Sequence, residues 1–445
     1  FGNKQMYGAS AYTQKTCGTA SSASSSSSPA RRRDRVVGRA FSFKSERIEI
    51  ERDPETRRTD LVRRALLSSL GLGALPALLE MRSVRSVAWA EGGEATATAD
   101  GTAELASARA RQGIDYRVAG PLQVLRLPRL KHIYTSCSTP ADRCTLKISA
   151  WVPQGGSSVG LKGPFPLAVI TSGFLIGSDQ YNSYAERLAS WGYVVVSYDF
   201  SQQVLDPTTD IECVKMLLEL IDWISTSGNP LSKVSDTENV MLIGHSRGGK
   251  ISTLAAINDT RVKSLFLIDP VDVTVYTPDD RISYPSATVA LSAAMTSKAS
   301  KELPVCVVGA GKGGDCAPVE SSFDLFYKAA RGPAWKAVIE EAGHLQFLDQ
   351  RAATAMGAFC QAGTSPDDDI KDVTRLMMVA WAETSVRRRD GSRIAMEASG
   401  ALGVARSSGG DGGDDDRTRA NEVIDGVYAA VKESPIPTMF EYKNF

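Results

Sequence analysis

Short, unbroken apolar runs alternate with amphipathic segments from residue 166 to residue 344, and this alternation constrains the fold more than any other feature. The apolar runs are PLAVIT (166–171), YVVVSYDF (193–200), NVMLIGH (239–245), VKSLFLIDP (262–270) and PVCVVGAG (304–311). Segments between them, such as DIECVKMLLELIDWISTSG, carry apolar residues at helical spacing and end at a glycine. Strands that are apolar along their whole length are typical of a parallel sheet covered by helices on both faces.

Two segments upstream of this alternation show a different period. Residues 115–130 and 144–153 alternate apolar and polar side chains, as half-buried antiparallel strands do. Antiparallel strands that lead into a mostly parallel, doubly covered sheet form the layout of the α/β-hydrolase fold. We therefore predict this fold for residues 114–390.

The pattern Gly-x-Ser-x-Gly occurs twice, and only its context can identify a functional copy. The copy at 156–160 lies in a glycine-rich loop without a strand before it, so we reject it. The other copy contains Ser246 between an apolar run and a helical segment, flanked by Gly244 and Gly248. This context predicts a nucleophile elbow, where strand and helix pass too closely for Cβ atoms. The alternative, a phosphate-binding turn, lacks the Gly-Lys-Ser/Thr of a P-loop.

A serine hydroxyl needs a general base before it can act as a nucleophile, and the chain contains three histidines. His132 lies in the antiparallel lead-in, and His245 adjoins Ser246 and should point away from it. His344 directly follows the segment WKAVIEEAG (335–343), which closes the series of sheet segments, and this is where the fold keeps its general base. By elimination, His344 is the predicted general base.

The acid that would orient the base is less well defined by the residues. The fold places it between the serine and the histidine in chain order. Asp269 ends the apolar run after that of Ser246, Asp272 follows three residues later, and Asp315 comes after the next run. The residues alone leave the acid open between Asp269 and Asp315.

An oxyanion hole requires two backbone N–H donors near the nucleophile. One is expected from Arg247, the residue after the serine, and the other from the loop that follows 166–171. That loop reads Ser-Gly-Phe, so Phe174 is the second predicted donor.

The seven cysteines contain no Cys-x-x-Cys pattern, so we predict neither a metal site nor a cofactor. Cys137 and Cys144 flank a turn-rich segment, and Cys306 and Cys316 flank a glycine loop. Either pair could form a short disulfide, and free buried thiols are an equal alternative.

The net charge is zero, but residues 1–90 contain 16 lysines and arginines against 8 acidic residues. The remaining chain is mildly acidic, which argues against a nucleic-acid partner. We expect a linker over 91–113, a disordered Gly/Asp-rich insertion over 391–421, and a C-terminal helix and tail over 422–445.

The basic head, residues 1–90, has the composition of a bipartite targeting signal that is removed. Residues 18–43 are rich in Ser, Ala and Arg, as organelle transit peptides are. Arg63 and Arg64 precede 15 uncharged residues, which suggests twin-arginine export to the thylakoid lumen of a plastid. The uncharged stretch is short for a membrane span and could instead form a buried helix. No other long apolar run occurs, so the mature protein is predicted to lack a transmembrane span.

With these residues in place, the chain resembles the chlorophyllase family. The matching motifs are GHSRGG (244–249), IDPVD (268–272), Asp222-Trp223, Cys-Ala-Pro (316–318), and Gly-His-Leu (343–345) followed by Leu348-Asp349. The resemblance covers residues 165–350 and assigns the acid to Asp269. Two departures, Ser-Gly-Phe for the family's usual His-Gly-Phe or His-Gly-Tyr and no glycine after DPVD, fit an algal member.

The resemblance implies a serine esterase that hydrolyses the phytyl ester of chlorophyll in the chloroplast, with peripheral contact to the thylakoid membrane. Residues 199–210 and 273–300 would then form a lid and pocket walls. Two other functions are compatible with the same residues. One is a general plastid lipase or carboxylesterase, and the other is a non-catalytic pigment-binding protein with a hydrolase shell.

Overall fold

The structure is a computed structural model that describes residues 115–135, 144–156, 161, 163–202, 207–294, 303–351, 360–387 and 414–443. The predicted targeting region (1–90), the linker (91–113) and residues 391–413 of the predicted insertion lie outside these ranges. Nothing in the structure therefore bears on the predicted signal.

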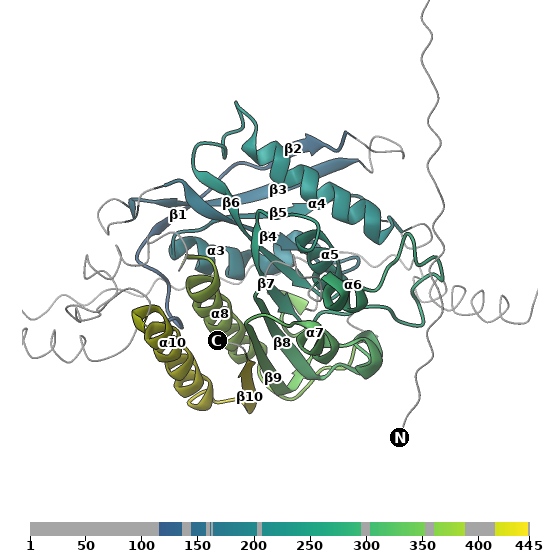
Figure 1. Cartoon of the computed structure of the whole chain (residues 1–445), viewed down its shortest axis with the longest axis vertical. Helices are drawn as coiled ribbons and strands as arrows, with labels where there is room; N and C mark the ends of the chain where they lie inside the picture. Colours follow the sequence, from purple (N-terminus) through teal and green to yellow (C-terminus); the bar gives the residue numbers. More distant parts are fainter. Residues whose placement is uncertain are drawn as a thin grey trace, which may run out of the picture. The chain divides into compact units, whose positions relative to one another are not determined.

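The described strands form one ten-stranded sheet in the order β1-β3-β5-β4-β6-β7-β8-β9-β10, with β2 paired to β3 (Figure 1). Their bounds are β1 Gln123–Arg126, β2 Leu130–Ile133, β3 Thr145–Gln154, β4 Phe165–Thr171, β5 Val194–Asp199, β6 Ser235–His245, β7 Val262–Ile268, β8 Val305–Lys312, β9 Ala334–Gly343 and β10 Thr438–Lys443. The six strands from β5 to β9 in this order are parallel. Strands β1, β2, β3 and β10 pair antiparallel to their neighbours. The predicted α/β-hydrolase fold, with antiparallel lead-in strands, is confirmed.

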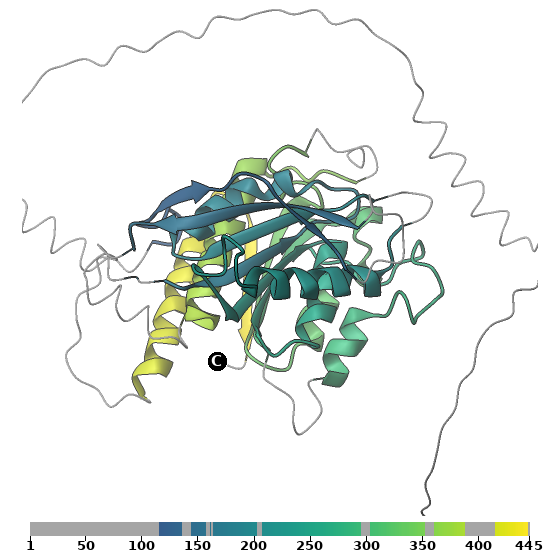
Figure 2. The same ribbon diagram turned by 90° about the horizontal axis from the view of Figure 1, so that it is seen from above.

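Helices cover both faces of this sheet, as Figures 1 and 2 show. Helices α3 (Asn182–Ser190), α8 (Asp367–Ser385) and α10 (Asp414–Lys432) pack on one face. The other face is covered by α4 (Asp210–Ser225), α5 (Arg247–Ala256), α6 (Ala287–Ala294) and α7 (Phe323–Ala329). Short 3-10 turns occur at η2 (Ser178–Tyr181), η3 (Gly314–Cys316) and η4 (Val319–Ser321).

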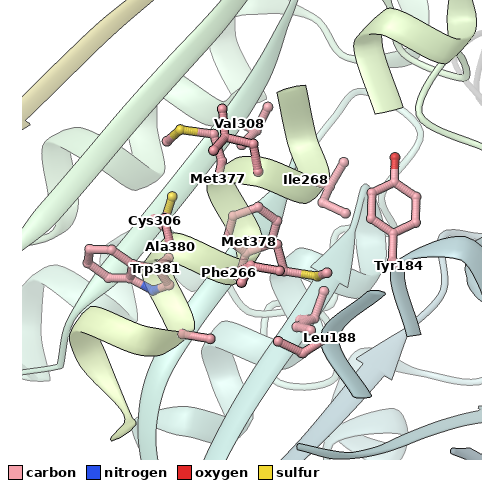
Figure 3. Close-up of a cluster of buried hydrophobic side chains, with 14 of the residues drawn as sticks. Tyr184, Leu188, Phe266, Ile268, Cys306, Val308, Met377, Met378, Ala380 and Trp381 are labelled. Carbon is pink, nitrogen blue, oxygen red and sulfur yellow. The ribbon is translucent and has the colours of Figure 1, made fainter. Parts of the chain in front are cut away.

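The double cover explains why the central strands are apolar throughout. Along β7, Phe266 and Ile268 enter the core beneath α3 and α8, whereas Leu265 and Leu267 enter the core beneath the other helices. Successive side chains of a strand point to opposite faces, so both sets must be apolar when both faces are buried. Figure 3 shows the first core, where Phe266 and Ile268 lie among side chains of α8 such as Met377.

The C-terminal part of the chain differs from the prediction. Helix α10 begins at Asp414, inside the segment expected to be disordered, rather than at residue 422. The tail after it forms β10, which extends the sheet by pairing with β9. Phe440 of β10 packs edge-on against Trp335 of β9, with ring centroids 5.7 Å apart. The catalytic fold therefore includes residues that lie far beyond 390.

Of the two alternatives for Cys306, the free buried thiol is confirmed, and the disulfide with Cys316 is wrong. Cys306 is a free, buried thiol at the start of β8, and Cys316 is bonded to Cys360. Strand β8 is extended and carries the chain away from Cys306 before it reaches Cys316, so the two thiols cannot meet. Cys144 is disulfide-bonded, and Cys137 lies outside the described residues.

Among the described residues, no helix has the length and hydropathy needed to cross a bilayer. The same part of the chain holds no cluster of three or more His, Cys, Asp or Glu side chains arranged to bind a metal ion.

Candidate active site

Ser246 occupies a sharp turn between β6 and α5, at the edge of the sheet where the parallel strands end. Its backbone has φ 56° and ψ −127°, a conformation that side chains rarely adopt. Three backbone hydrogen bonds hold the turn. The N–H of Ser246 donates to the carbonyl of Ile268, and its carbonyl accepts from the N–H of Gly249 and of Val271, at 3.0–3.2 Å. This combination of a strained backbone and a fixed turn projects the serine side chain out of the sheet.

The glycines beside Ser246 are required by close backbone contacts. A Cβ atom on Gly244 would lie 2.3 Å from the carbonyl oxygen of Gly248. A Cβ atom on Gly248 would lie 2.2 Å from the carbonyl oxygen of Thr171. Both separations are far shorter than any van der Waals contact, so the strand, the helix and the end of β4 can approach only if both positions are glycine. The predicted elbow geometry is present.

His344 directly follows β9, and its imidazole ring lies within hydrogen-bonding distance of Ser246. Its Nε2 atom lies 2.9 Å from Ser246 Oγ, and its Nδ1 atom lies 2.6 Å from Asp269 Oδ2. Because an ionised carboxylate only accepts, Nδ1 carries the proton and Nε2 presents a lone pair to the serine hydroxyl. The arrangement can therefore withdraw a proton from Ser246.

Asp269 is held in place as firmly as the serine. It follows β7 with φ 37°, and its side chain is fully buried. Its second carboxylate oxygen, Oδ1, accepts a hydrogen bond of 2.9 Å from the backbone N–H of Ala310. Both oxygens are thus satisfied, and the carboxylate is fixed toward the ring of His344.

The two other candidate acids lie elsewhere. Asp272 caps α6 by accepting hydrogen bonds from Ser286, Ala287 and Thr288. Asp315 lies exposed in η3, after β8. Strand β7 is the direct neighbour of β6, so a residue that ends β7 is closer to Ser246 than one that follows β8. The structure therefore brings Asp269, and not Asp315, to the serine and histidine.

The predicted oxyanion donors flank Ser246. Arg247 is the first residue of α5, and Phe174 lies in the loop after β4. A Cβ atom on Gly173, next to Phe174, would lie 3.2 Å from the Cβ of Ser246, so this loop packs directly against the nucleophile. The Arg247 guanidinium lies 5.6 Å from the centroid of the Phe174 ring. The loop that contains Phe174 thus lies against Ser246, and the Phe174 ring lies near the side chain of Arg247.

A shallow hollow lies beside this loop. Five aromatic or aliphatic residues and five polar or charged residues line it, together with Gly173. Its lining is Thr171, Ser172, Gly173, Phe174, Ile176, Tyr198, Asp199, Phe200, Gln202, Arg247 and Ile251.

A buried ion network beneath the elbow was missed by the sequence reasoning. Asp210 Oδ1 lies 2.7 Å from Arg247 Nε, and Asp210 Oδ2 lies 2.8 Å from Lys250 Nζ. Lys250 Nζ also lies 4.0 Å from Asp272 Oδ1. The lysine is only 1% exposed, and a charge on an otherwise apolar helix was the signal that could have indicated this network. These ion pairs tie the elbow helix to the start of α4.

Comparisons with known proteins identify the family of this chain. A sequence model described as Chlorophyllase matches residues 157–401, more than half of the chain. Chlorophyllase-2 of Arabidopsis thaliana is 27% identical over 208 residues, which cover 42% of this chain and 62% of that protein. Chlorophyllase-1 of the same plant is 25% identical over 248 residues, covering 50% and 73%. Chlorophyllase-1, chloroplastic, of Citrus unshiu is 22% identical over 237 residues, covering 49% and 68%. The chain thus spans less than two thirds of the length of Chlorophyllase-2.

Proposed function

Because the chain belongs to the chlorophyllase family, we propose that it is a serine esterase that hydrolyses the phytyl ester of chlorophyll to chlorophyllide and phytol. The observation that carries the proposal is the unbroken chain of contacts from Ser246 Oγ to His344 Nε2, and from His344 Nδ1 to Asp269 Oδ2. A protein that only bound the pigment would have no need for this chain of contacts.

The first half of the reaction forms an acyl-enzyme. Ser246 Oγ attacks the ester carbonyl carbon while its proton passes to His344 Nε2. The negative charge that develops on the carbonyl oxygen is stabilised by the backbone N–H groups of Arg247 and Phe174. Asp269 stabilises the imidazolium and keeps its orientation. When the tetrahedral intermediate collapses, the C–O bond to phytol breaks, and the phytol oxygen takes the proton from His344.

The second half regenerates the enzyme. His344 removes a proton from a water molecule, whose oxygen attacks the acyl carbon on Ser246. The bond to Ser246 Oγ then breaks, the serine recovers its proton from His344, and chlorophyllide leaves. No group other than these side chains, the two backbone donors and water is needed.

The surroundings of the site are consistent with a large apolar substrate. The segments that follow β7 and β8 carry five aliphatic or aromatic residues that are each 68–92% exposed. They are Val275, Tyr276, Ile282, Val289 and Val319. Large apolar side chains that are this exposed favour contact with lipid or with a hydrocarbon chain. They support peripheral contact with a pigment-bearing membrane.

The segments expected to form the lid and pocket walls contact each other where they are described. The Tyr284 hydroxyl donates to the carbonyl of Pro207 at 3.3 Å, and the N–H of Ile211, the residue after the first segment, donates to the carbonyl of Ser283 at 3.2 Å. Phe200 and Gln202, from the first segment, line the hollow. These contacts support a role for both segments in enclosing substrate.

We further propose a chloroplast location, which the printed name of the Citrus relative supports. Export to the thylakoid lumen through the twin-arginine segment is a separate proposal. It rests on residues 63–90 of the sequence alone.

The direct test incubates the full chain and a Ser246→Ala variant with chlorophyll a in mild detergent, and then separates pigment by polarity. The wild-type chain should yield chlorophyllide and free phytol, and Ser246→Ala should yield neither while unfolding at a similar temperature. Ser252→Ala, on the same helix, is the matched control and should keep full activity. Cleavage of p-nitrophenyl or galactolipid esters without cleavage of chlorophyll would instead establish a general lipase.

A further inference from the structure

His245 precedes the nucleophile but takes no part in the reaction derived above. Its side chain is fully buried, and its ring stacks on that of His344 with centroids 4.8 Å apart. A second imidazole this close to the general base needs an explanation, because a positive charge on it would oppose the charge that His344 acquires.

The hydrogen bonds of His245 fix where its single proton lies. Nε2 is 3.0 Å from the backbone carbonyl of His344, which can only accept, so Nε2 carries the proton. Nδ1 is 2.8 Å from the hydroxyl of Tyr181 and must accept from it. Burial raises the pKa of Tyr181 above its ordinary value, so the hydroxyl keeps its proton for this bond. Burial, and secondarily the neighbouring His344, holds the pKa of His245 well below its ordinary value.

The Tyr181 hydroxyl makes a further contact with the backbone of Gly173. The N–H of Gly173 points to this oxygen at 3.4 Å. Gly173 is the residue before the predicted oxyanion donor Phe174, and it packs against both Ser246 and His245. One continuous path of hydrogen bonds thus runs from Gly173 through Tyr181 and His245 to the backbone of His344.

We propose that Tyr181 and His245 are positioning residues. They hold the loop after β4, which contains Phe174, and the loop that contains His344 in fixed positions relative to each other and to Ser246. The bridge is neutral, so it restrains both loops without placing a charge beside the imidazolium that forms on His344. This inference rests on the proposed serine-esterase function, and it concerns residues that do not touch the substrate.

The test measures hydrolysis of p-nitrophenyl butyrate by the full chain, so it does not depend on the pigment. Tyr181→Phe removes the central hydroxyl and should lower kcat about tenfold, with KM changed by less than about twofold. The matched control is Tyr193→Phe. It deletes an equally buried hydroxyl, bonded to Glu383 at 2.9 Å, in a part of the core away from the site. It should lower the unfolding temperature at least as much and leave kcat unchanged.

A second pair of variants covers the case in which Tyr181→Phe does not fold. His245→Gln keeps an N–H group that can donate to the His344 carbonyl, whereas His245→Leu has none. The glutamine variant should retain at least about tenfold more kcat than the leucine variant.

Four outcomes would overturn the inference. The first is wild-type kcat in folded Tyr181→Phe, and the second is equal kcat in the glutamine and leucine variants. A wild-type chain that cleaves no ester would overturn the proposed function, and the inference with it. Loss of activity in Tyr193→Phe to the same extent as in Tyr181→Phe would also count against a positioning role.

Discussion

The interior of the sheet and the edge where its parallel strands end differ in the kind of residue that they contain, although the two regions meet between consecutive residues of one strand end. Leu267 and Ile268 end β7 fully buried in apolar surroundings, and Asp269 follows with an equally buried carboxylate. Among the described residues, Leu175, Ser246 and Asp269 are the non-glycine positions with positive φ. All three follow strands β4, β6 and β7, so backbone strain is concentrated at this edge.

The apolar interior and the strained edge therefore place different requirements on their side chains. The interior needs apolar volume, which several side chains can supply, and it yields stability. The edge needs particular atoms at particular distances, and rigid strands hold its strained residues in place. Substitutions in the two regions should therefore affect different quantities.

The largest effect is expected at the acid. Asp269→Asn keeps the size of the side chain but removes the charge that fixes the tautomer of His344, so kcat should fall about 10⁴-fold. Unfolding monitored by circular dichroism should change little by comparison. Asp315→Asn, at the exposed alternative acid, serves as the control and should leave kcat unchanged. A greater loss in Asp315→Asn than in Asp269→Asn would reverse the assignment.

The interior should show the opposite behaviour. Phe266→Ala removes a fully buried ring from the core in Figure 3 and should lower the free energy of unfolding by about 3–5 kcal/mol. Esterase kcat, measured well below the new melting temperature, should stay within about threefold of wild type. Val118→Ala, at a position 54% exposed, should change stability by less than about 0.5 kcal/mol. Equal losses of kcat in Phe266→Ala and Asp269→Asn would remove the distinction between the regions.

The smallest effect concerns pH and links the two regions through His245. Burial, together with His344, holds the pKa of His245 well below 6.5, whereas the unfolded chain binds the proton near 6.5. The unfolded state therefore binds more protons as the pH falls below about 6.5. His245 should then lower the free energy of unfolding by up to about 1.4 kcal/mol for each pH unit below about 6.5. Urea unfolding at pH 7, 6 and 5 should show that the free energy of unfolding falls less steeply with decreasing pH in His245→Gln than in the wild-type chain. Equal slopes of this free energy against pH in the two proteins would contradict the assignment of a buried neutral ring.

Much of the interior could be predicted from the sequence because apolar periodicity directly reports burial on both faces of a sheet. Strands β4 to β8 coincide with the five apolar runs to within a few residues. Strand β10 was missed because Thr438–Lys443 is a half-exposed edge strand, and its pairing with β9 depends on residues far away in the chain.

The edge was only partly predictable. Ser246 and His344 could be found because a local motif and a short list of histidines identify them. The choice between Asp269 and Asp315 depends on which strand lies beside β6, and chain order does not contain that information. The pairing of Cys316 with Cys360 and the ion pairs of Asp210 are likewise contacts between distant segments, which no local pattern reports.

The most direct test of the central claim is covalent labelling of the full chain with a fluorophosphonate, followed by digestion and mass spectrometry of the labelled peptide. We expect one modified residue, Ser246, and labelling slowed by several orders of magnitude in His344→Gln, because the serine then lacks its base. Labelling at another serine, or an unchanged rate in His344→Gln, would contradict a nucleophile at the strained edge of the sheet.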